Sequence, residues 1–261
     1  MKLATLASGS SGNATVIKGG KTTLLVDAGL SGKGIESRLE AIGVNPRELS
    51  GIFVTHEHID HIKGVGVLAR KHRLPVYALE PCISAMEVGK LPSGCCQPLS
   101  AGQCLEIGDL KLELVETFHD SVASTGLVCY HDETKVGVAT DTGQVSPQMV
   151  RKLKGCDALV FEANHDETML WKGRYPYHLK RRIAAPTGHL SNTDAGAALV
   201  EIIDENTKRL ILAHLSEENN LPELALNSVA QILTDAGVPE VATALKIRTA
   251  PRHDPLMVSV G

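Results

Sequence analysis

The sequence predicts an α/β protein in which two sheets are sandwiched between helical layers. Strand-like segments followed by helix-like segments occur twice along the 261 residues, and this order favours two sheets with helices on their outer faces. Aromatic residues make up 3% of the chain, so the core must consist mainly of Leu, Val, Ile and Ala, as in parallel or mixed sheets covered by helices. No segment has a linker-like composition, and we expect a single domain over residues 1–261.

The first half of the chain begins with strands and continues into a mixed pattern. Short apolar segments at residues 3–7, 14–17 and 22–26 are separated by glycine-rich turns, which predicts an antiparallel meander. The segments that follow are a helix at 34–42, a strand at 51–54, a helix at 65–72 and an extended stretch at 75–78. This second stretch has the order β-α-β.

The second half repeats the order of strands before helices. The polar turn at residues 132–134 predicts a hairpin between strands at 127–131 and 135–139. The other predicted elements are a strand at 105–115, a helix at 147–153, a strand at 158–161, a helix at 193–204, a strand at 210–213 and a helix at 221–236. These strands predict a second sheet.

Composition limits the location and the redox state of the protein. Residues 1–10 reach Ser and Gly before a signal-peptide core can develop, and no later apolar run has transmembrane length. We therefore expect a soluble cytoplasmic protein with no membrane partner. The six cysteines include no C-x-x-C pair, and Cys95 and Cys96 are adjacent, so we expect reduced, mostly structural thiols.

The net charge of −4 does not by itself indicate a nucleic-acid binder, but one segment is strongly basic. Residues 171–182 contain no acid and alternate cations with aromatic rings, namely Lys172, Arg174, Lys180, Arg181 and Arg182 with Trp171, Tyr175 and Tyr177. Cations interleaved with stacking rings suit a phosphate backbone. A solvated helix face with buried rings explains the same composition equally well.

The most informative motif is H-x-H-x-D-H, which directly follows the apolar run at residues 51–54. Its four ligand-type side chains lie within six residues: His56, His58, Asp60 and His61. Imidazole and carboxylate ligands suit zinc, manganese or iron. Such a cluster at the end of a strand indicates a metal site more strongly than a chance group of surface histidines. If the ligands divide between two ions, hydrolysis is the leading chemistry.

This motif, with Asp27 and Gly29 at the end of an earlier strand, resembles the metallo-β-lactamase superfamily of hydrolases. The other family segments occur in the expected order: F-H-D at 118–120, A-T-D-T-G at 139–143 and A-H-L-S at 213–216. The resemblance extends from residue 3 to about residue 214. It implies the four-layer αββα sandwich of the metallo-β-lactamase fold.

The resemblance also implies two divalent metal ions, with zinc, manganese and iron left open. The family pattern places one ion on His56, His58 and His119, the other on Asp60, His61 and His214, and Asp141 on both. It implies that Asp60 serves catalysis as well as metal binding. Asp27 is expected either to accept an N–H group from a metal-bound imidazole or to be a simple strand-end turn residue.

Two later segments, at residues 161–166 and 188–195, point to phosphodiester chemistry. Glu162 and His189 resemble the paired glutamate and histidine of the tRNA 3′-processing endonucleases of this superfamily. The resemblance implies that His189, oriented by Glu162, either donates a proton to the leaving oxygen or only binds phosphate. Ser191 and Asn192 precede a helical run, where free amides would receive a phosphate, although capping by Ser191 explains the same pattern.

The glycine- and serine-rich segment at residues 8–13 is interpreted as a hairpin turn, with a place beside the site as the alternative. Together, the segments are most similar to the YycJ/WalJ-type branch, whose members are regarded as DNA exonucleases. The resemblance implies a 5′ to 3′ exonuclease in which a metal-bridging hydroxide attacks phosphorus. Many nucleic-acid-processing members carry a large inserted domain, for which this chain has no room between Asp141 and His214.

Substrate contacts are therefore expected from Lys172, Arg174, Lys180, Arg181, Ser191 and Asn192. DNA is favoured over RNA as the partner, and the oligomeric state stays open between a monomer and a dimer. One alternative is a hydrolase of a small thioester, lactone or cyclic phosphodiester. The other is a regulatory binding protein that keeps its metals for structure.

Overall fold

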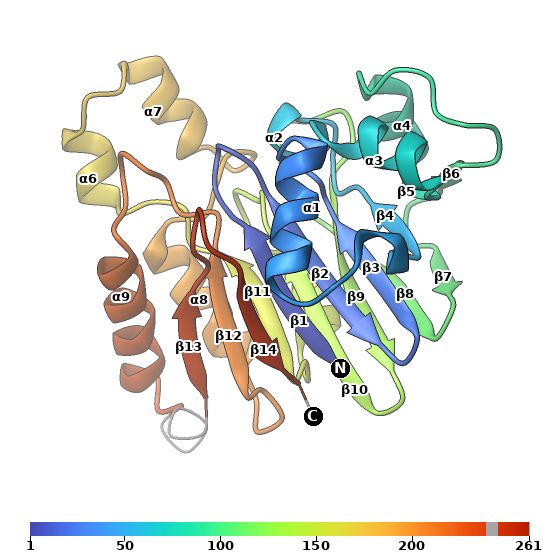
Figure 1. Ribbon diagram of the computed structural model, residues 1–261. Helices are drawn as coiled ribbons and strands as arrows, with labels where there is room; N and C mark the ends of the chain where they lie inside the picture. Colours follow the sequence, from blue (N-terminus) through green and yellow to red (C-terminus); the bar gives the residue numbers. More distant parts are fainter. Residues whose placement is uncertain (239–244, 261) are drawn as a thin grey trace.

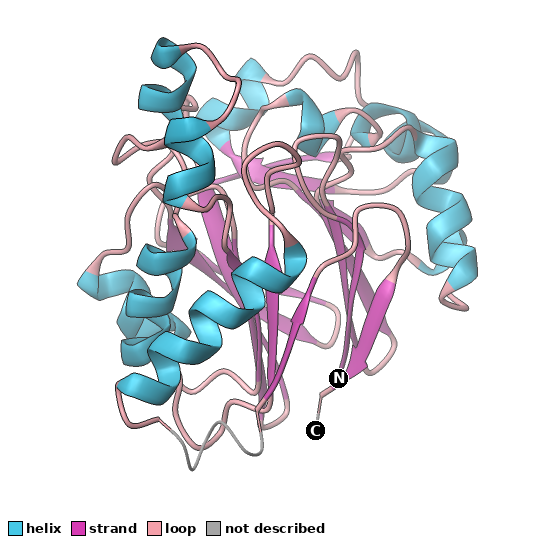
Figure 2. Cartoon of the chain, turned by 90° about the vertical axis from the view of Figure 1, so that its left-hand side faces the viewer, coloured by secondary structure: helices cyan, strands magenta, loops and turns pink. Residues whose placement is uncertain are grey.

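The computed structural model describes residues 1–238 and 245–260 and contains two sheets packed face to face (Figures 1 and 2). The first sheet has the strand order β14 (Leu256–Ser259), β1 (Lys2–Ala7), β2 (Ala14–Gly19), β3 (Thr22–Val26), β4 (Gly51–Phe53), β5 (Val76–Leu79) and β6 (Cys96–Leu99). The second has the order β13 (Lys246–Thr249), β12 (Arg209–Ala213), β11 (Ala158–Glu162), β10 (Thr134–Ala139), β9 (Thr125–His131), β8 (Leu110–Glu116) and β7 (Cys104–Ile107).

Helices cover the outer face of each sheet. Those beside the first sheet are α1 (Gly32–Ala41), α2 (Ile59–Ile62), α3 (Val65–His72) and α4 (Glu80–Ala85), with a 3-10 turn at Pro46–Glu48. Those beside the second are α5 (Pro147–Leu153), α8 (Asn192–Ile202) and α9 (Pro222–Asp235). Two short helices, α6 (Glu167–Lys172) and α7 (Tyr177–Ile183), lie beyond the strand ends at the upper left of Figure 1. The predicted four-layer αββα sandwich is confirmed.

The side chains of the second sheet alternate between two hydrophobic cores. On β11, Ala158 and Val160 belong to the core shared with the first sheet, whereas Leu159 and Phe161 pack into the core beneath α5, α8 and α9. Both faces of this strand are therefore buried, which explains its continuous apolar sequence. Because Phe161 is fully buried, Phe161→Ala should lower the free energy of unfolding by about 3–5 kcal/mol.

Strand direction brings several strand ends to one edge of the sandwich. In the first sheet, β3 and β4 are parallel. In the second, β10, β11 and β12 are parallel. Both β8 and β10 pair antiparallel with β9 and so run in the same direction. The residues that follow these strands are therefore placed for a common site.

Most predicted elements occur where they were expected, including the antiparallel meander of β1, β2 and β3 and the β9–β10 hairpin. The single strand predicted at 105–115 is wrong, because Gly108 adopts a left-handed φ of 55° and turns the chain between β7 and β8. The Asp109 carboxylate fixes this turn by accepting a hydrogen bond of 2.7 Å from the Lys21 amide. The short elements β6, β13, β14, α2, α4, α6 and α7 were not predicted.

All six cysteines are unpaired thiols, as expected. Burial raises the pKa of Cys82, Cys129 and Cys156 to about 12, so these three are unreactive at neutral pH. Among the helices that the structure describes, none has both the length and the apolar character needed to cross a membrane. The single domain over residues 1–261 stays a prediction.

Candidate metal centre

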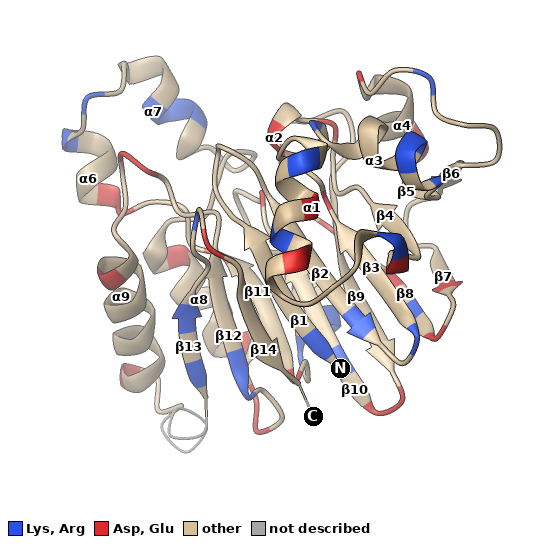
Figure 3. Cartoon of the chain, viewed as in Figure 1, with Lys and Arg blue, Asp and Glu red and all other residues tan. Residues whose placement is uncertain are grey.

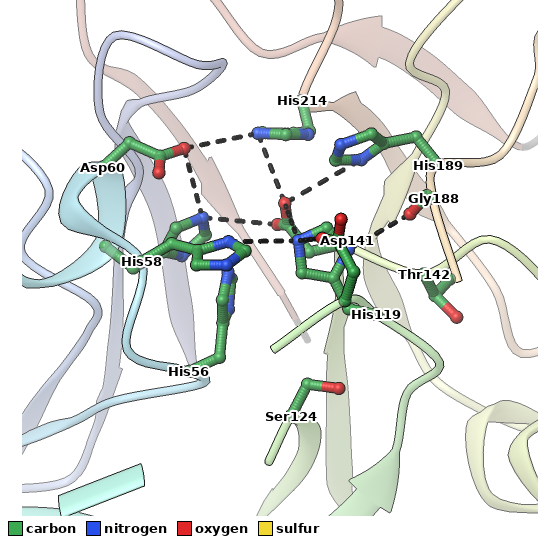
Figure 4. Close-up of polar contacts among 12 residues, drawn as sticks. His56, His58, Asp60, His119, Ser124, Asp141, Thr142, Gly188, His189 and His214 are labelled. Atoms are coloured by element: carbon green, nitrogen blue, oxygen red, sulfur yellow. Dashed lines mark hydrogen bonds and ion pairs between the residues drawn. The ribbon is translucent and has the colours of Figure 1, made fainter. Parts of the chain in front are cut away.

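The predicted ligands come together at the carboxyl ends of the strands (Figure 4). The H-x-H-x-D-H motif leads from β4 into α2, His119 follows β8, Asp141 follows β10, and His214 follows β12. They line or adjoin a cavity of about 240 Å³, which His58, Asp60, His119, Asp141, His189 and His214 help to form. Parts of both sheets are thus needed to assemble this site.

One group of donor atoms comes from His56, His58 and His119, and these atoms lie within 4.8 Å of one another. Nδ1 of His58 is 3.2 Å from Nε2 of His119. The other ring nitrogen of His119 lies 3.1 Å from the carbonyl oxygen of Gly188, to which it is positioned to donate. The protein thus fixes the His119 ring so that Nε2 points toward His58.

A second group comes from Asp60, His61 and His214, whose donor atoms also lie within 4.8 Å of one another. Oδ2 of Asp60 is 3.5 Å from Nε2 of His61 and 3.7 Å from Nε2 of His214. The opposite nitrogen of the His61 ring, Nδ1, lies 2.7 Å from Asp27 Oδ2. Asp27 therefore orients His61, and its role behind a metal-bound imidazole stays a prediction.

Asp141 lies between the two groups of donor atoms. Its Oδ1 is 3.4 Å from Nε2 of His214 and 3.9 Å from Nε2 of His119, and its Oδ2 is 3.4 Å from Nε2 of His61. Figure 4 shows this carboxylate with the imidazole rings around it. One side chain therefore contacts both groups.

Unpartnered buried atoms show that this donor set fits divalent metal ions. Nε2 of His56, Nε2 of His214 and Oδ2 of Asp141 are buried and have no hydrogen-bond partner among the described residues. A native protein rarely leaves such atoms without a partner. Burial acts to lower the pKa of His214, but Asp141, Asp60 and Glu162 outweigh burial and raise the pKa to about 10. The surrounding carboxylates therefore favour positive charge at this position.

Three site residues depart from the ordinary backbone conformation. Asp27, Asp141 and His214 each follow a strand and have φ values of 60°, 58° and 57°. The left-handed region costs a residue with a side chain roughly 1–2 kcal/mol, and such costs concentrate at functional sites. The sharp turn at each strand end directs the side chain into the site.

Glu162, the last residue of β11, contacts two histidines through one oxygen. Its Oε1 lies 2.7 Å from Nδ1 of His189 and 3.1 Å from Nδ1 of His214. Its Oε2 accepts a 2.8 Å hydrogen bond from the Thr142 amide. Burial raises the pKa of this fully buried carboxyl, but His189 and His214 outweigh burial and hold the pKa below its usual range. Glu162 is therefore an anion that orients both rings.

His189 lines the cavity, where the resemblance of Glu162 and His189 to the paired residues of the tRNA 3′-processing endonucleases led us to expect it. The structure also places donor atoms of Asp141, Glu162, His189 and His214 within 4.8 Å of one another. This grouping makes a role for His189 as a metal ligand an alternative that has to be tested. The same position of His189 is therefore compatible with a proton donor and with a metal ligand.

Ser191 and Asn192 lie outside the cavity, although they were expected to bind substrate. Both are buried, and neither lines the cavity. Ser191 Oγ accepts a hydrogen bond from the Asp194 amide and so caps α8. The Asn192 side chain exchanges hydrogen bonds of 3.0 and 2.9 Å with Asn220. These contacts hold the start of α8 in place.

The basic segment covers the end of α6, the turn that follows it and most of α7, where Figure 3 shows several cations. Lys172, Arg174 and Arg181 are exposed and do not line the cavity. Lys180 donates hydrogen bonds to the carbonyl oxygens of Trp171 and Gly173 and so fixes the turn.

Trp171 and Tyr177 are 46% and 68% exposed, so the alternative of buried rings is wrong for these two. Their ring centroids are 6.2 Å apart. The exposed pair is therefore available for stacking at the surface of this segment.

The segment at residues 8–13, for which a place beside the site was the alternative to a plain hairpin turn, supplies several residues of the site. Nδ2 of Asn13 lies 3.0 Å from Nε2 of His61 and 3.3 Å from Oδ2 of Asp60. Ser10 lines the cavity, and Ser8 Oγ accepts the His214 amide at 2.7 Å. The segment at residues 8–13 therefore lies beside the site as well as forming a turn. Its only sequence signal was a set of small polar residues directly after a strand.

Comparison with known proteins agrees with this fold. The model of the Beta-lactamase superfamily domain matches residues 22–215. The chain therefore belongs to this superfamily. It is a hydrolase with the metallo-β-lactamase fold.

More specific similarities support the predicted branch. The chain is 46% identical over 234 residues to "Exodeoxyribonuclease YycJ" of Bacillus anthracis, covering 89% of each chain. It is 42% identical over 260 residues to "Exodeoxyribonuclease WalJ" of Streptococcus pneumoniae, covering 94% of this chain and 97% of the relative. A solved structure, the metallo-beta-lactamase fold protein YhfI from Bacillus subtilis, matches with a TM-score of 0.74 and 16% identity over 98% of this chain and 99% of that one. The last similarity concerns the fold alone.

Proposed function

We propose that this protein is a dinuclear metal-dependent phosphodiesterase that degrades DNA from an end, in the 5′ to 3′ direction. The observation that carries the proposal is the contact of Asp141 with both groups of donor atoms in a cavity that also contains the Glu162–His189 pair. Two relatives that match nearly the whole chain are named exodeoxyribonucleases, which supports DNA as the substrate. A cytoplasmic location is part of the same proposal.

The donor groups give the proposed metal ligands. His56, His58 and His119 would hold one ion, Asp60, His61 and His214 would hold the other, and Asp141 would contact both. When bound, two divalent ions supply an activated water molecule and neutralise charge on the phosphate and on the leaving oxygen. Zinc, manganese and iron all suit these ligands.

The chain itself supplies the proton donor in this proposal. Glu162 accepts from Nδ1 of His189, which leaves the other ring nitrogen of His189 for the substrate. A protonated His189 would donate to the leaving oxygen of the DNA strand, and Glu162 would stabilise the charged ring. The exposed Lys172, Arg174 and Arg181, with Trp171 and Tyr177, would contact the strand outside the cavity.

Replacement of His189 by alanine tests the proposed acid. We expect the turnover number to fall about 10²–10⁴-fold, the usual contribution of a general acid, while the metal content stays at the wild-type value. Turnover on labelled DNA with added manganese and elemental analysis of the purified variant measure the two effects. His253→Ala, at an exposed position that does not line the cavity, is the control. Loss of metal from His189→Ala would instead make His189 a ligand.

The direction and the substrate class need a separate assay. Oligonucleotides of DNA and RNA that carry either a 5′ or a 3′ label should show release of the 5′ label first, and from DNA more readily than from RNA. Binding should weaken steeply with salt, because the substrate is a polyanion. Salt-independent binding of a small thioester, lactone or cyclic phosphodiester would favour the small-molecule alternative.

A further inference from the structure

Arg182 is the one Lys or Arg among the described residues that lines the cavity of the metal centre. It lies on α7, whose residues Leu179, Arg182 and Ile183 all line the same cavity. The spacing of three and four positions places these side chains on one face of the helix. Helix α7 is therefore a wall of the cavity, and Arg182 is the cation of that wall.

Arg182 is paired with Asp120, a residue from another segment of the cavity lining. Its Nε donates to Oδ2 of Asp120, and its Nη2 donates to Oδ1 at 3.2 Å. Asp120 directly follows the proposed metal ligand His119 and also lines the cavity. Two parallel N–H donors matched to two oxygens are the arrangement by which arginine binds either a carboxylate or a phosphate.

The ion pair is open to exchange. The side chains of Arg182 and Asp120 are 59% and 30% exposed, and exposed ion pairs contribute little to stability. Asp60 and Asp141 also line the cavity, but both are proposed metal ligands. Beyond the proposed metal ions, the Arg182 fork is the one Lys or Arg group that the described residues place at this cavity to bind a phosphate.

We infer that Arg182 binds the phosphate of the substrate inside the cavity and that the Asp120 carboxylate occupies the same fork until a phosphate replaces it. The inference rests on the proposed phosphodiesterase function, and it names the residue that selects the substrate. A neutral ester would have to leave the Arg182–Asp120 pair intact, whereas two phosphate oxygens substitute for the two carboxylate oxygens. The outward-facing cations of α6 and α7 do not have this access.

The decisive experiment compares Arg182→Ala with Asp120→Asn. Binding of inorganic phosphate is measured by isothermal titration calorimetry on the manganese-loaded protein, with metal content checked for every variant. We expect Arg182→Ala to raise the dissociation constant for phosphate at least about tenfold, the loss of one charged hydrogen-bonding partner. We expect Asp120→Asn to lower it severalfold, because the competing negative charge is removed.

Opposite effects distinguish a phosphate site from a purely structural ion pair. A structural pair is broken by either substitution, so both variants would then shift the dissociation constant in the same direction, which would overturn the inference. An unchanged constant in Arg182→Ala would also overturn it. Arg182→Lys should recover part of the affinity, since it restores charge without the planar fork. Arg151→Ala, on the exposed side of α5, is the matched control and should stay within twofold of wild type.

Degradation of labelled DNA by the same variants links the inference to the proposed function. Arg182→Ala should raise KM more than it lowers kcat, because the arginine contacts a phosphate in both the bound and the reacting substrate. If the wild-type protein degrades no DNA, the proposed nuclease function fails. The phosphate titration still decides the role of Arg182 in that case.

Discussion

At the scale of single residues, one oxygen of Glu162 serves two imidazole rings with different proposed tasks. Oε1 accepts from Nδ1 of both His189 and His214. With a proton held on Nδ1, Nε2 is the free position of each ring: on His214 it would offer its lone pair to a metal, and on His189 it would carry the second proton that the proposed acid donates. Nε2 of His214 is buried without a hydrogen-bond partner among the described residues, as expected for an atom that binds a metal. Glu162 thus sets the tautomer of a proposed ligand as well as that of the proposed acid.

Glu162→Gln should therefore impair both tasks. The Thr142 amide donates to Oε2, so the amide oxygen of glutamine would take that position and its NH2 group would face the two Nδ1 atoms. Each ring would then have to move its proton to Nε2. We expect metal affinity to fall about 10–100-fold, the usual effect of losing a carboxylate behind a metal-bound histidine.

Competition with a chelator and steady-state turnover measure the two effects of Glu162→Gln. The variant should lose metal affinity and turnover together, in contrast to His189→Ala, which should lose turnover alone. Unchanged metal affinity would show that His214 does not depend on Glu162.

At the scale of elements, three chain segments meet at Gly29, immediately after β3. A side chain at this position would collide with the carbonyl oxygen of Asp60 and the amide of Asn13. The Asn13 amide donates to the Asp60 carbonyl oxygen at 2.8 Å, and the Gly29 amide donates to the Asn13 carbonyl oxygen at 2.8 Å. The Asp-x-Gly segment therefore positions the loop that carries two proposed ligands, Asp60 and His61.

Gly29→Ala should displace this loop without abolishing the fold. We expect a loss of stability of about 1–3 kcal/mol, typical of forcing extra atoms into a packed region, and weakened binding of the ion proposed for Asp60, His61 and His214. Urea denaturation and metal stoichiometry provide the measurements. Gly34→Ala in α1 is a suitable control, because the nearest atom to its new side chain would be Ser31 Oγ at 3.2 Å. Full retention of both ions in Gly29→Ala would contradict this role for the close approach.

The sequence predicted the fold and the positions of the proposed ligands because both depend on local patterns. Apolar segments followed by His or Asp identify strand ends, and strand ends meet where the strands run in the same direction. No comparable sequence pattern tells which way a side chain on a short helix points. Helix α7 contains no fully buried residue, so its sequence lacks an apolar period that would separate Arg182, in the cavity, from its neighbour Arg181, outside it.

The same limit explains the buried positions of Ser191 and Asn192. A polar pair before a helix has the same sequence whether it binds a ligand or caps the helix. For Asn192 the contact with Asn220, which lies 28 positions away in the chain, decides between the two. Such contacts become visible only in three dimensions.

At the scale of the whole molecule, the two sheets contribute complementary parts of the donor set. The loop after β4 in the first sheet carries His56, His58, Asp60 and His61, and the strands of the second sheet carry His119, Asp141 and His214. Each proposed ion would therefore join residues from both sheets. Ions that bind the folded state but not the unfolded state would stabilise the contact between the two halves of the sandwich.

Metal binding should consequently raise the melting temperature. At a free-ion concentration of about 1,000 times Kd, one site contributes roughly 4 kcal/mol, and for a chain of this size each kcal/mol corresponds to about 2–4 °C. We expect thermal scans with manganese to melt roughly 8–16 °C above scans with a chelator. Asp141→Ala should show a much smaller difference. Equal melting temperatures for metal-loaded and metal-free wild-type protein would contradict cross-sheet binding.

The left-handed conformations of Asp27, Asp141 and His214 have a consequence for selection. Glycine adopts such φ values without steric cost, so the backbone at these three positions does not by itself favour the side chains that the site uses. In a mutant library screened only for expression and heat resistance, with a chelator present so that metal binding contributes nothing, glycine should accumulate there. Under selection for activity, the same positions should keep their side chains, so a comparison of the two libraries separates what the fold requires from what the chemistry requires.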